Sequence, residues 1–158
     1  MPSFLTRSRL AMAATAALTL AVLPASAATA ASTSCVSMSQ TSVQKKVLSD
    51  VNAARKKAGK KALTASSSMA KVALRWSEKQ AASKTMKHNP KYASQIPKGW
   101  TAAAENVAYG YSPTKVTPAW LKSAGHRKNI LGGYNRMGVA VACSKSGQPY
   151  YTQVFGKY

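Results

Sequence analysis

The stretch AWLKSAGHRKNILGG, residues 119–133, holds His126, one of only two histidines in the chain. A glycine precedes this histidine and two cations, Arg127 and Lys128, follow it. In this setting His126 either works in a site, as a ligand or an acid–base group, or ties a loop to a helix. The choice depends on which other residues the fold brings to it.

The first 27 residues have the pattern of a secretory signal peptide. Two arginines in MPSFLTRSRL precede a short apolar run, and the small-residue site ASA ends at Ala27. The apolar run is shorter than the roughly 20 residues of a membrane-spanning helix. We therefore expect residues 1–27 to be removed, residues 28–40 to form a flexible leader, and the mature protein to be secreted.

The mature chain is strongly basic. Removing Arg7 and Arg9 leaves 23 − 2 = 21 Lys and Arg against 3 Asp and Glu, a net charge of +18. Such a field draws anions and keeps copies of the chain apart, so we expect a monomer with an anionic partner. A lysine-rich surface that is only solvated is the alternative.

The two cysteines, Cys35 and Cys143, lie near the two ends of the mature chain. In an exported protein an even pair predicts a disulfide. A reactive or metal-bound thiol is the alternative, although this spacing fits no zinc knuckle.

Hydrophobic periodicity predicts an α+β domain. Two amphipathic helices come first, with apolar faces at Val43, Val47, Val51 and Ala54, and at Met69, Val72 and Trp76. Gly59 stands where the first helix should end. A short strand at AENVAYG, a helix opening at Ser112–Pro113, and a hairpin of RMGVAVAC and PYYTQVFG around SKSG complete an antiparallel sheet with helices.

The order of these motifs resembles the secreted CAP (SCP-like) domains over residues 41–156. A helix pair leads to His88 in KHNP, then Glu105 in AENVAYG, AWLKSAGHRKNIL, and the MGVAVAC–YYTQVFG hairpin. The resemblance implies a three-layer α-β-α sandwich with a central antiparallel sheet, and we assign it to residues 41–158.

The resemblance also implies an open cleft. Family members with a full cleft have two histidines and two carboxylates, and some bind zinc or another divalent cation. His88 and His126 match the histidines and Glu105 matches the first carboxylate, whereas the second would fall near Ser123, where this chain has no acid. The three residues therefore form either a metal site or a hydrogen-bonded group that orders the loops.

Hydrolytic mechanisms find little support in the sequence. A paired-carboxylate mechanism needs two acids at one site, and only Glu105 lies near the histidines. No G-x-S-x-G elbow accompanies Ser123, so a serine or thiol nucleophile is not expected. We assign no catalytic residue, and a metal-dependent extracellular enzyme stays as an alternative.

Binding of an anionic, partly apolar ligand fits the residues better. Arg127 and Lys128 supply cations, and Tyr109, Tyr111 and Trp120 supply aromatic surface, unless these aromatics belong to the core. A lipid, or a porphyrin such as haem, has the matching chemistry. The chain is also similar to secreted antioxidants of the radical oxygenase type, but only in its export, size and basicity. This looser similarity implies a radical-scavenging role with haem.

Two other partners follow from charge alone. Adhesion to anionic cell-wall polymers is an alternative for a basic exported protein. Specific nucleic-acid binding is not expected, since no recognition motif is present.

Overall fold

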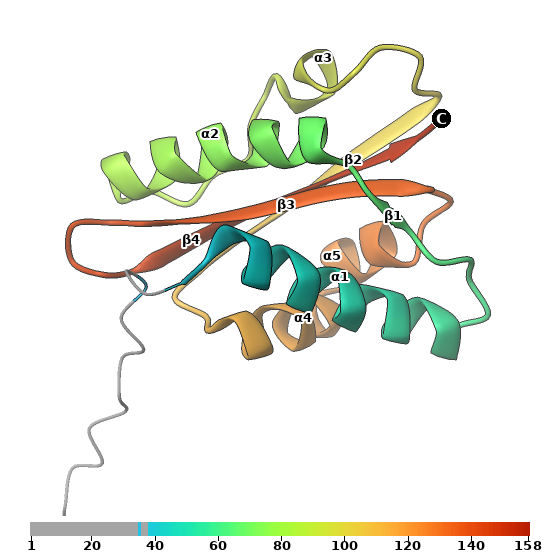
Figure 1. Ribbon diagram of the computed structural model, residues 1–158, viewed down its shortest axis with the longest axis horizontal. Coiled ribbons are helices and arrows are strands. Elements are labelled where there is room, and N and C mark those ends of the chain that lie inside the picture. The colour runs from blue at the N-terminus through green and yellow to red at the C-terminus, as the bar shows by residue number, and fades with distance from the viewer. Residues whose placement is uncertain (1–34, 36–37) are drawn as a thin grey trace, which may run out of the picture. The chain divides into compact units, whose positions relative to one another are not determined.

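In the computed structural model, which describes Cys35 and residues 38–158, a four-stranded sheet lies between two layers of helices (Figure 1). The elements in chain order are α1 (Gln40–Lys57), β1 (Thr64–Ala65), α2 (Ser67–Ser83), α3 (Tyr92–Gln95), β2 (Ala102–Tyr109), α4 (Pro113–Lys122), α5 (Ala124–Ile130), β3 (Arg136–Cys143) and β4 (Pro149–Lys157). Helices α2 and α3 cover one face of the sheet, and α1, α4 and α5 cover the other. This arrangement confirms the predicted α+β sandwich. The predicted signal peptide and residues 28–34, 36 and 37 of the predicted leader lie outside the described residues, and Gln40 of that leader already belongs to α1.

Helix α1 packs its predicted valine stripe against the sheet, with one difference. The buried residues are Val43, Val47, Val51 and then Arg55, whereas Ala54 is only half-buried. The prediction that Ala54 is the fourth core position was therefore wrong. Arg55 takes this position, because its guanidinium forms hydrogen bonds inside the protein. The helix ends at Lys57, and the predicted terminator Gly59 follows its cap with a φ of 67°, which suits a residue without a side chain.

Helix α2 begins at a serine cap and approaches the sheet very closely. The hydroxyl of Ser66 accepts a hydrogen bond from the backbone N–H of Met69 at 3.3 Å. At Gly138 of β3, a Cβ atom would lie only 2.2 Å from the backbone nitrogen of Ala70. The small residues that alternate along RMGVAVAC therefore let a helix lie directly on the strand.

The sheet has the order β1-β3-β4-β2. The predicted hairpin is confirmed as β3 and β4, which pair antiparallel, and β4 also pairs antiparallel with β2. Strand β2 extends over eight residues and is longer than the short strand predicted. The two-residue β1, which pairs parallel with β3, and the short helices α3 and α5 were not predicted, because elements this short show no periodicity.

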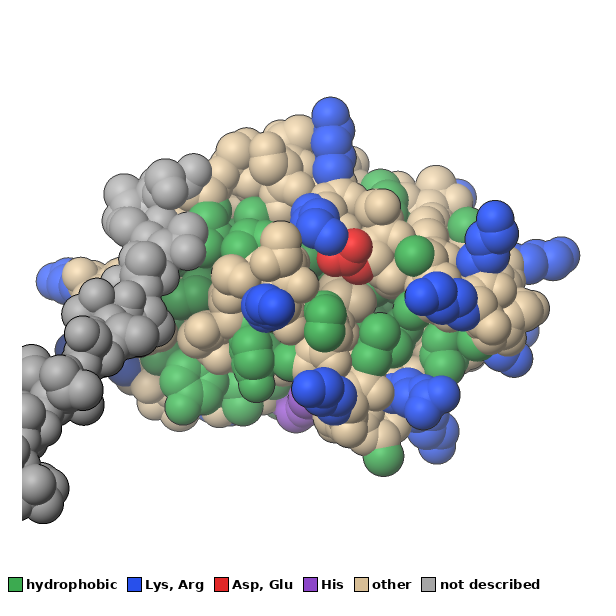
Figure 2. Space-filling model, turned by 90° about the horizontal axis from the view of Figure 1, so that it is seen from below, with side chains coloured by type: hydrophobic (Ala, Val, Ile, Leu, Met, Phe, Trp, Pro, Cys, Tyr) green, Lys and Arg blue, Asp and Glu red, His purple; other side chains and the backbone are tan. Residues whose placement is uncertain are grey.

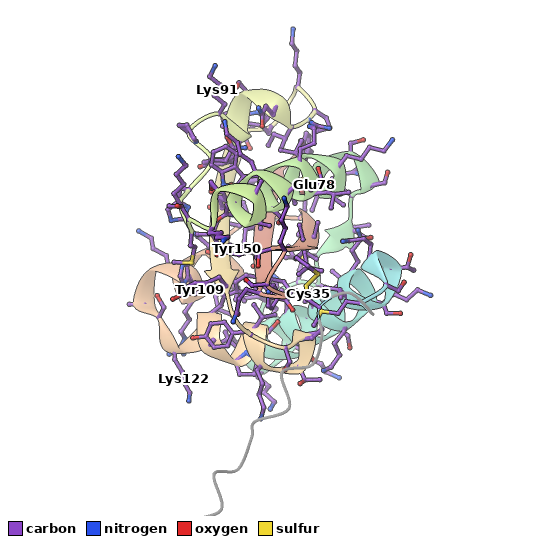
Figure 3. The ribbon with its side chains drawn as sticks, turned by 90° about the vertical axis from the view of Figure 1, so that its left-hand side faces the viewer. Cys35, Glu78, Lys91, Tyr109, Lys122 and Tyr150 are labelled. Atoms are coloured by element: carbon purple, nitrogen blue, oxygen red, sulfur yellow. A yellow bond between two sulfur atoms is a disulfide. The ribbon has the colours of Figure 1, made fainter. Side chains whose placement is uncertain are left out.

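The predicted disulfide joins Cys35 to Cys143, with a Cα–Cα distance of 5.6 Å (Figure 3). It ties Cys35, which lies shortly before α1, to the end of β3, 108 positions along the chain. Within the described part of the chain, no helix combines the length and apolarity needed to cross a bilayer.

Candidate functional site

Glu105 is a buried carboxylate on the outermost strand of the sheet. Its residue is 4% exposed, and one carboxylate oxygen, Oε1, lies 2.9 Å from Nδ1 of His88 and accepts the backbone N–H of Asn89 at 2.8 Å. The other oxygen, Oε2, is buried with no partner among the described residues. Burial raises the pKa of Glu105, and the bonds from Asn89 and His88 lower it in part.

His126 lies on α5, and two asparagines fix that helix against β2. The amide nitrogen of Asn106 donates to the carbonyl of His126 at 3.3 Å, and that of Asn129 donates to the Asn106 side chain at 2.9 Å. Burial, and secondarily the charge of His88, lowers the pKa of His126. The imidazole lines the same cavity as the Glu105–His88 pair, and the lowered pKa favours its neutral form near pH 7.

These groups line a polar cavity of about 570 Å³. Its walls are His88, Tyr92, Ala103, Ala104, Glu105, Ser123, Gly125, His126, Lys128, Asn129 and Tyr134. The exposed Lys128 places a cation on its rim, and Ser123 occupies the region where the second carboxylate of the cleft was missing.

The geometry gives the zinc hypothesis no support. Two imidazoles and a carboxylate are the right donor types for zinc. Across Cys35 and residues 38–158, however, no three His, Cys, Asp or Glu side chains are grouped closely enough to hold a metal ion. Metal binding by His88, Glu105 and His126 stays a prediction.

An apolar cavity of about 460 Å³ adjoins the polar one. Met86, Tyr109 and Tyr111 line it and are 43%, 53% and 42% exposed, which is high for large apolar side chains. Tyr109 lies beside Tyr150, with ring centroids 5.8 Å apart (Figure 3). This contact stacks the Tyr109 ring on Tyr150, and more than half of Tyr109 stays exposed.

The two cavities share Ser123 and His126 in their walls, and together we call them the groove. The groove follows the outer edge of β2, which pairs with β4 on one side only of the described sheet. Side chains donate hydrogen bonds to alternate backbone carbonyls of this edge. The pairs are Tyr92 Oη to Ala103 O at 3.4 Å, Asn129 Nδ2 to Glu105 O at 3.0 Å, and Trp120 Nε1 to Val107 O at 3.0 Å. Because these acceptors are taken, a ligand would meet side chains here instead of adding a strand.

The structure brings together most of the residues named from the sequence. His88 and Glu105 touch, and His126 and Lys128 share their cavity. Tyr109, Tyr111 and Trp120 line the apolar cavity, although Trp120 is only 1% exposed and serves mainly as core. Arg127 is exposed and lines neither cavity, so the structure does not place it in the predicted ligand site.

Sequence reasoning missed Met86, Tyr92 and Asn129 among the residues of the groove. Met86 lines the apolar cavity, Tyr92 lines the polar cavity, and Asn129 joins α5 to β2. Asn129 could have been noticed as a polar residue inside the GHRKNIL segment. Met86 and Tyr92 carried no local signal, since only the folded chain brings them to the site.

Comparisons with known proteins agree with this geometry. Residues 48–155 match the sequence profile of the "Cysteine-rich secretory protein family" (CAP). A Bacillus subtilis (strain 168) relative, "Uncharacterized protein YkwD", is 32% identical over 142 residues, which are 85% of this chain and 55% of that protein. The chain thus spans little more than half of that relative's length.

Solved structures show the same fold at lower identity. An outer surface protein from Borrelia burgdorferi has a TM-score of 0.70 at 20% identity and matches over 76% of this chain and 96% of its own. An extracellular protein with an SCP domain from Bacillus anthracis has a TM-score of 0.63 at 22% identity, over 75% and 41% of the two chains.

Proposed function

The chain belongs to the cysteine-rich secretory protein (CAP) family, and from this premise we propose that it is exported and binds an anionic, partly apolar ligand in the groove. One observation carries the proposal. An aromatic, apolar cavity and a polar cavity with a cationic rim meet at Ser123 and His126. Each volume lies within the range of about 300–1,000 Å³ that is typical of small-molecule sites.

The apolar part of the ligand would lie on Tyr109, Tyr111 and Met86. Their exposure leaves apolar surface in water, which a flat ring or an acyl chain would cover with a gain in free energy. Stacking on the exposed Tyr109 ring suits a planar ring in particular.

The charge of the protein favours an anion. Of the three acids in the mature chain, Asp50 pairs with Lys46 at 2.6 Å and Glu105 is buried against His88. Glu78 is therefore the one exposed acid without an ion pair in the part of the chain that the structure describes. Lys128 brings a cation to the polar cavity, where a ligand carboxylate or phosphate would find it.

A porphyrin or a lipid combines these properties. A bound haem would be held by Tyr109, Tyr111 or His126, and it would supply the redox chemistry of an antioxidant role. The metal-dependent enzyme has no observation in its favour, so binding is the function we propose.

Titration with haem, followed by the Soret absorbance at low and high salt, tests the proposal. We expect a saturable shift that weakens at high salt, because the cationic contribution is screened. Tyr109→Ala and Tyr111→Ala should each weaken binding. Trp100→Ala is the matched control, since Trp100 is 38% exposed and lines neither cavity.

A second pair of variants tests the cationic rim. Lys128→Gln should weaken binding, whereas Lys71→Gln, which removes the same charge from exposed α2 surface, should not. Haem that gives no saturable shift at either salt would remove the porphyrin version. If a fatty acid and an anionic lysolipid also fail to bind, the proposed function is wrong.

A further inference from the structure

Four lysines surround the tight turn that ends α1, and we call them the lysine turn. They are Lys56, Lys57, Lys60 and Lys61, and all four are exposed. The turn lies between them at Gly59, whose positive φ reverses the chain. Figure 2 looks onto the layer of α1, α4 and α5 and shows Lys and Arg side chains over this face, with many toward its right-hand end, where α1 ends in Figure 1.

The backbone of the lysine turn is held from both sides. The N–H of Gly59 donates to the carbonyl of Lys56 at 3.1 Å, and the N–H of Lys60 donates to the carbonyl of Arg55 at 2.9 Å. The guanidinium of Arg55 in turn donates from Nε to the carbonyl of Lys61 at 2.8 Å. The four ammonium groups thus extend from a fixed backbone, which reduces the entropy lost when a ligand binds.

The lysines of the turn form no ion pair in the described structure. The contacts between a basic and an acidic side chain are Lys46–Asp50 and His88–Glu105, and neither involves the lysine turn. The helix dipole favours cations in the last turn, which accounts for Lys56 and Lys57 but not for Lys60 and Lys61 beyond the helix. The buried Arg55 adds a fifth positive charge directly beneath.

We propose that the lysine turn binds a flexible polymer that carries phosphate groups at regular intervals, of the poly(glycerol phosphate) type, outside the cell. Several cations close together suit a ligand with several negative charges in succession, because each contact releases a condensed counterion. Lysines act as point charges without the bidentate geometry of arginine, so they suit a polymer of variable conformation. This inference does not depend on the groove.

The surroundings of the lysine turn argue against a membrane or a nucleic acid. Membrane-surface elements combine cations with large apolar side chains, whereas the residues between and after these lysines are Ala58, Gly59 and Ala62. The exposed large apolar side chains of the described residues lie elsewhere, at Met86, Trp100, Tyr109, Tyr111 and Tyr158. The turn also offers no aromatic ring on which a base could stack.

The test compares two variants of the mature protein with equal net charge. The first changes all four residues of the lysine turn to Gln. The second changes four exposed lysines that are spread over other elements, Lys71, Lys91, Lys98 and Lys115, to Gln. Binding to immobilised poly(glycerol phosphate) is measured between about 50 and 200 mM salt, and thermal unfolding confirms that both variants fold.

We expect the lysine-turn variant to lose at least about tenfold in affinity, and its log–log salt slope to fall by about 3, since four contacts to a flexible polyanion contribute about 0.7 each. The scattered variant should change the affinity by less than about threefold, and Lys128→Gln should bind the polymer normally. Equal losses in the two quadruple variants would show that bulk charge alone binds the polymer, and would overturn the proposal. Tighter binding to duplex DNA or to phosphatidylglycerol vesicles than to the polymer would overturn it as well.

Discussion

Arg55→Met should destabilise the protein more than any other loss of a single cation in the described region. Arg55 is 2% exposed and has no carboxylate partner there. Its guanidinium donates instead to four backbone carbonyls, those of Lys61 at 2.8 Å, Ile130 at 2.7 Å, Gly132 at 2.8 Å and Tyr134 at 3.2 Å. One side chain thus holds the turn after α1 and the loop after α5.

The magnitude follows from those four bonds. A buried acceptor left without a donor costs about 1–3 kcal/mol, and a partly buried bond that water can replace contributes about 0.5–1 kcal/mol. The bond to Ile130 is fully buried and the other three are partly buried. Methionine would restore some packing of the stem, so we expect a net loss of about 3–5 kcal/mol, a large share of the roughly 5–15 kcal/mol of a typical domain.

Urea unfolding of the disulfide-intact protein measures this loss. With a slope of about 1–3 kcal/mol per molar urea, the midpoint should fall by roughly 2 M at an unchanged slope. Arg55→Lys should lie in between, because an ammonium cannot reach four separate carbonyls. The control is Lys56→Met, which removes the neighbouring exposed charge and should change stability by less than about 0.5 kcal/mol. A loss below about 1 kcal/mol in Arg55→Met would refute the reasoning.

Two further predictions concern packing and pH. Gly138→Ala places a Cβ 2.2 Å from the backbone nitrogen of Ala70, so calorimetry should show that the free energy of unfolding falls by about 2–3 kcal/mol. The control Gly133→Ala, whose Cβ would have no atom within 4 Å, should be neutral or slightly stabilising. Equal melting temperatures of the two variants would contradict this packing. Burial lowers the pKa of His126 below its ordinary 6.5. Just below that pH the unfolded state therefore binds more protons than the folded state, and protonation favours unfolding. The stability of the wild type should thus fall relative to that of His126→Gln as the pH falls from about 7 to about 5. The raised pKa of Glu105 acts in the opposite direction, so wild type and variant must be compared at each pH, and a difference that does not change with pH would disprove the assignment.

The sequence by itself determined the parts of this protein that depend on neighbours along the chain. The valine stripe of α1 and its end before Gly59 follow from spacing and from the backbone freedom of glycine. The β3–β4 hairpin follows from alternation around a turn, and the disulfide follows from a single cysteine pair in a chain with a signal peptide. Resemblance to a family added the layered fold and the pairing of His88 with Glu105.

Only the tertiary structure decided what depends on contacts far along the chain. From the sequence, Arg55 has the pattern of a surface cation. In the folded chain it donates to the carbonyls of residues 130, 132 and 134, which lie 75 to 79 positions further along the sequence. The groove likewise exists only once α4 and α5 lie along the outer edge of β2, where Asn129 and Trp120 occupy its carbonyls. Local patterns report which face of an element is apolar, but burial and hydrogen-bond partners belong to the packed chain. For that reason the sequence could name most residues of the groove but not the contacts that hold them in place.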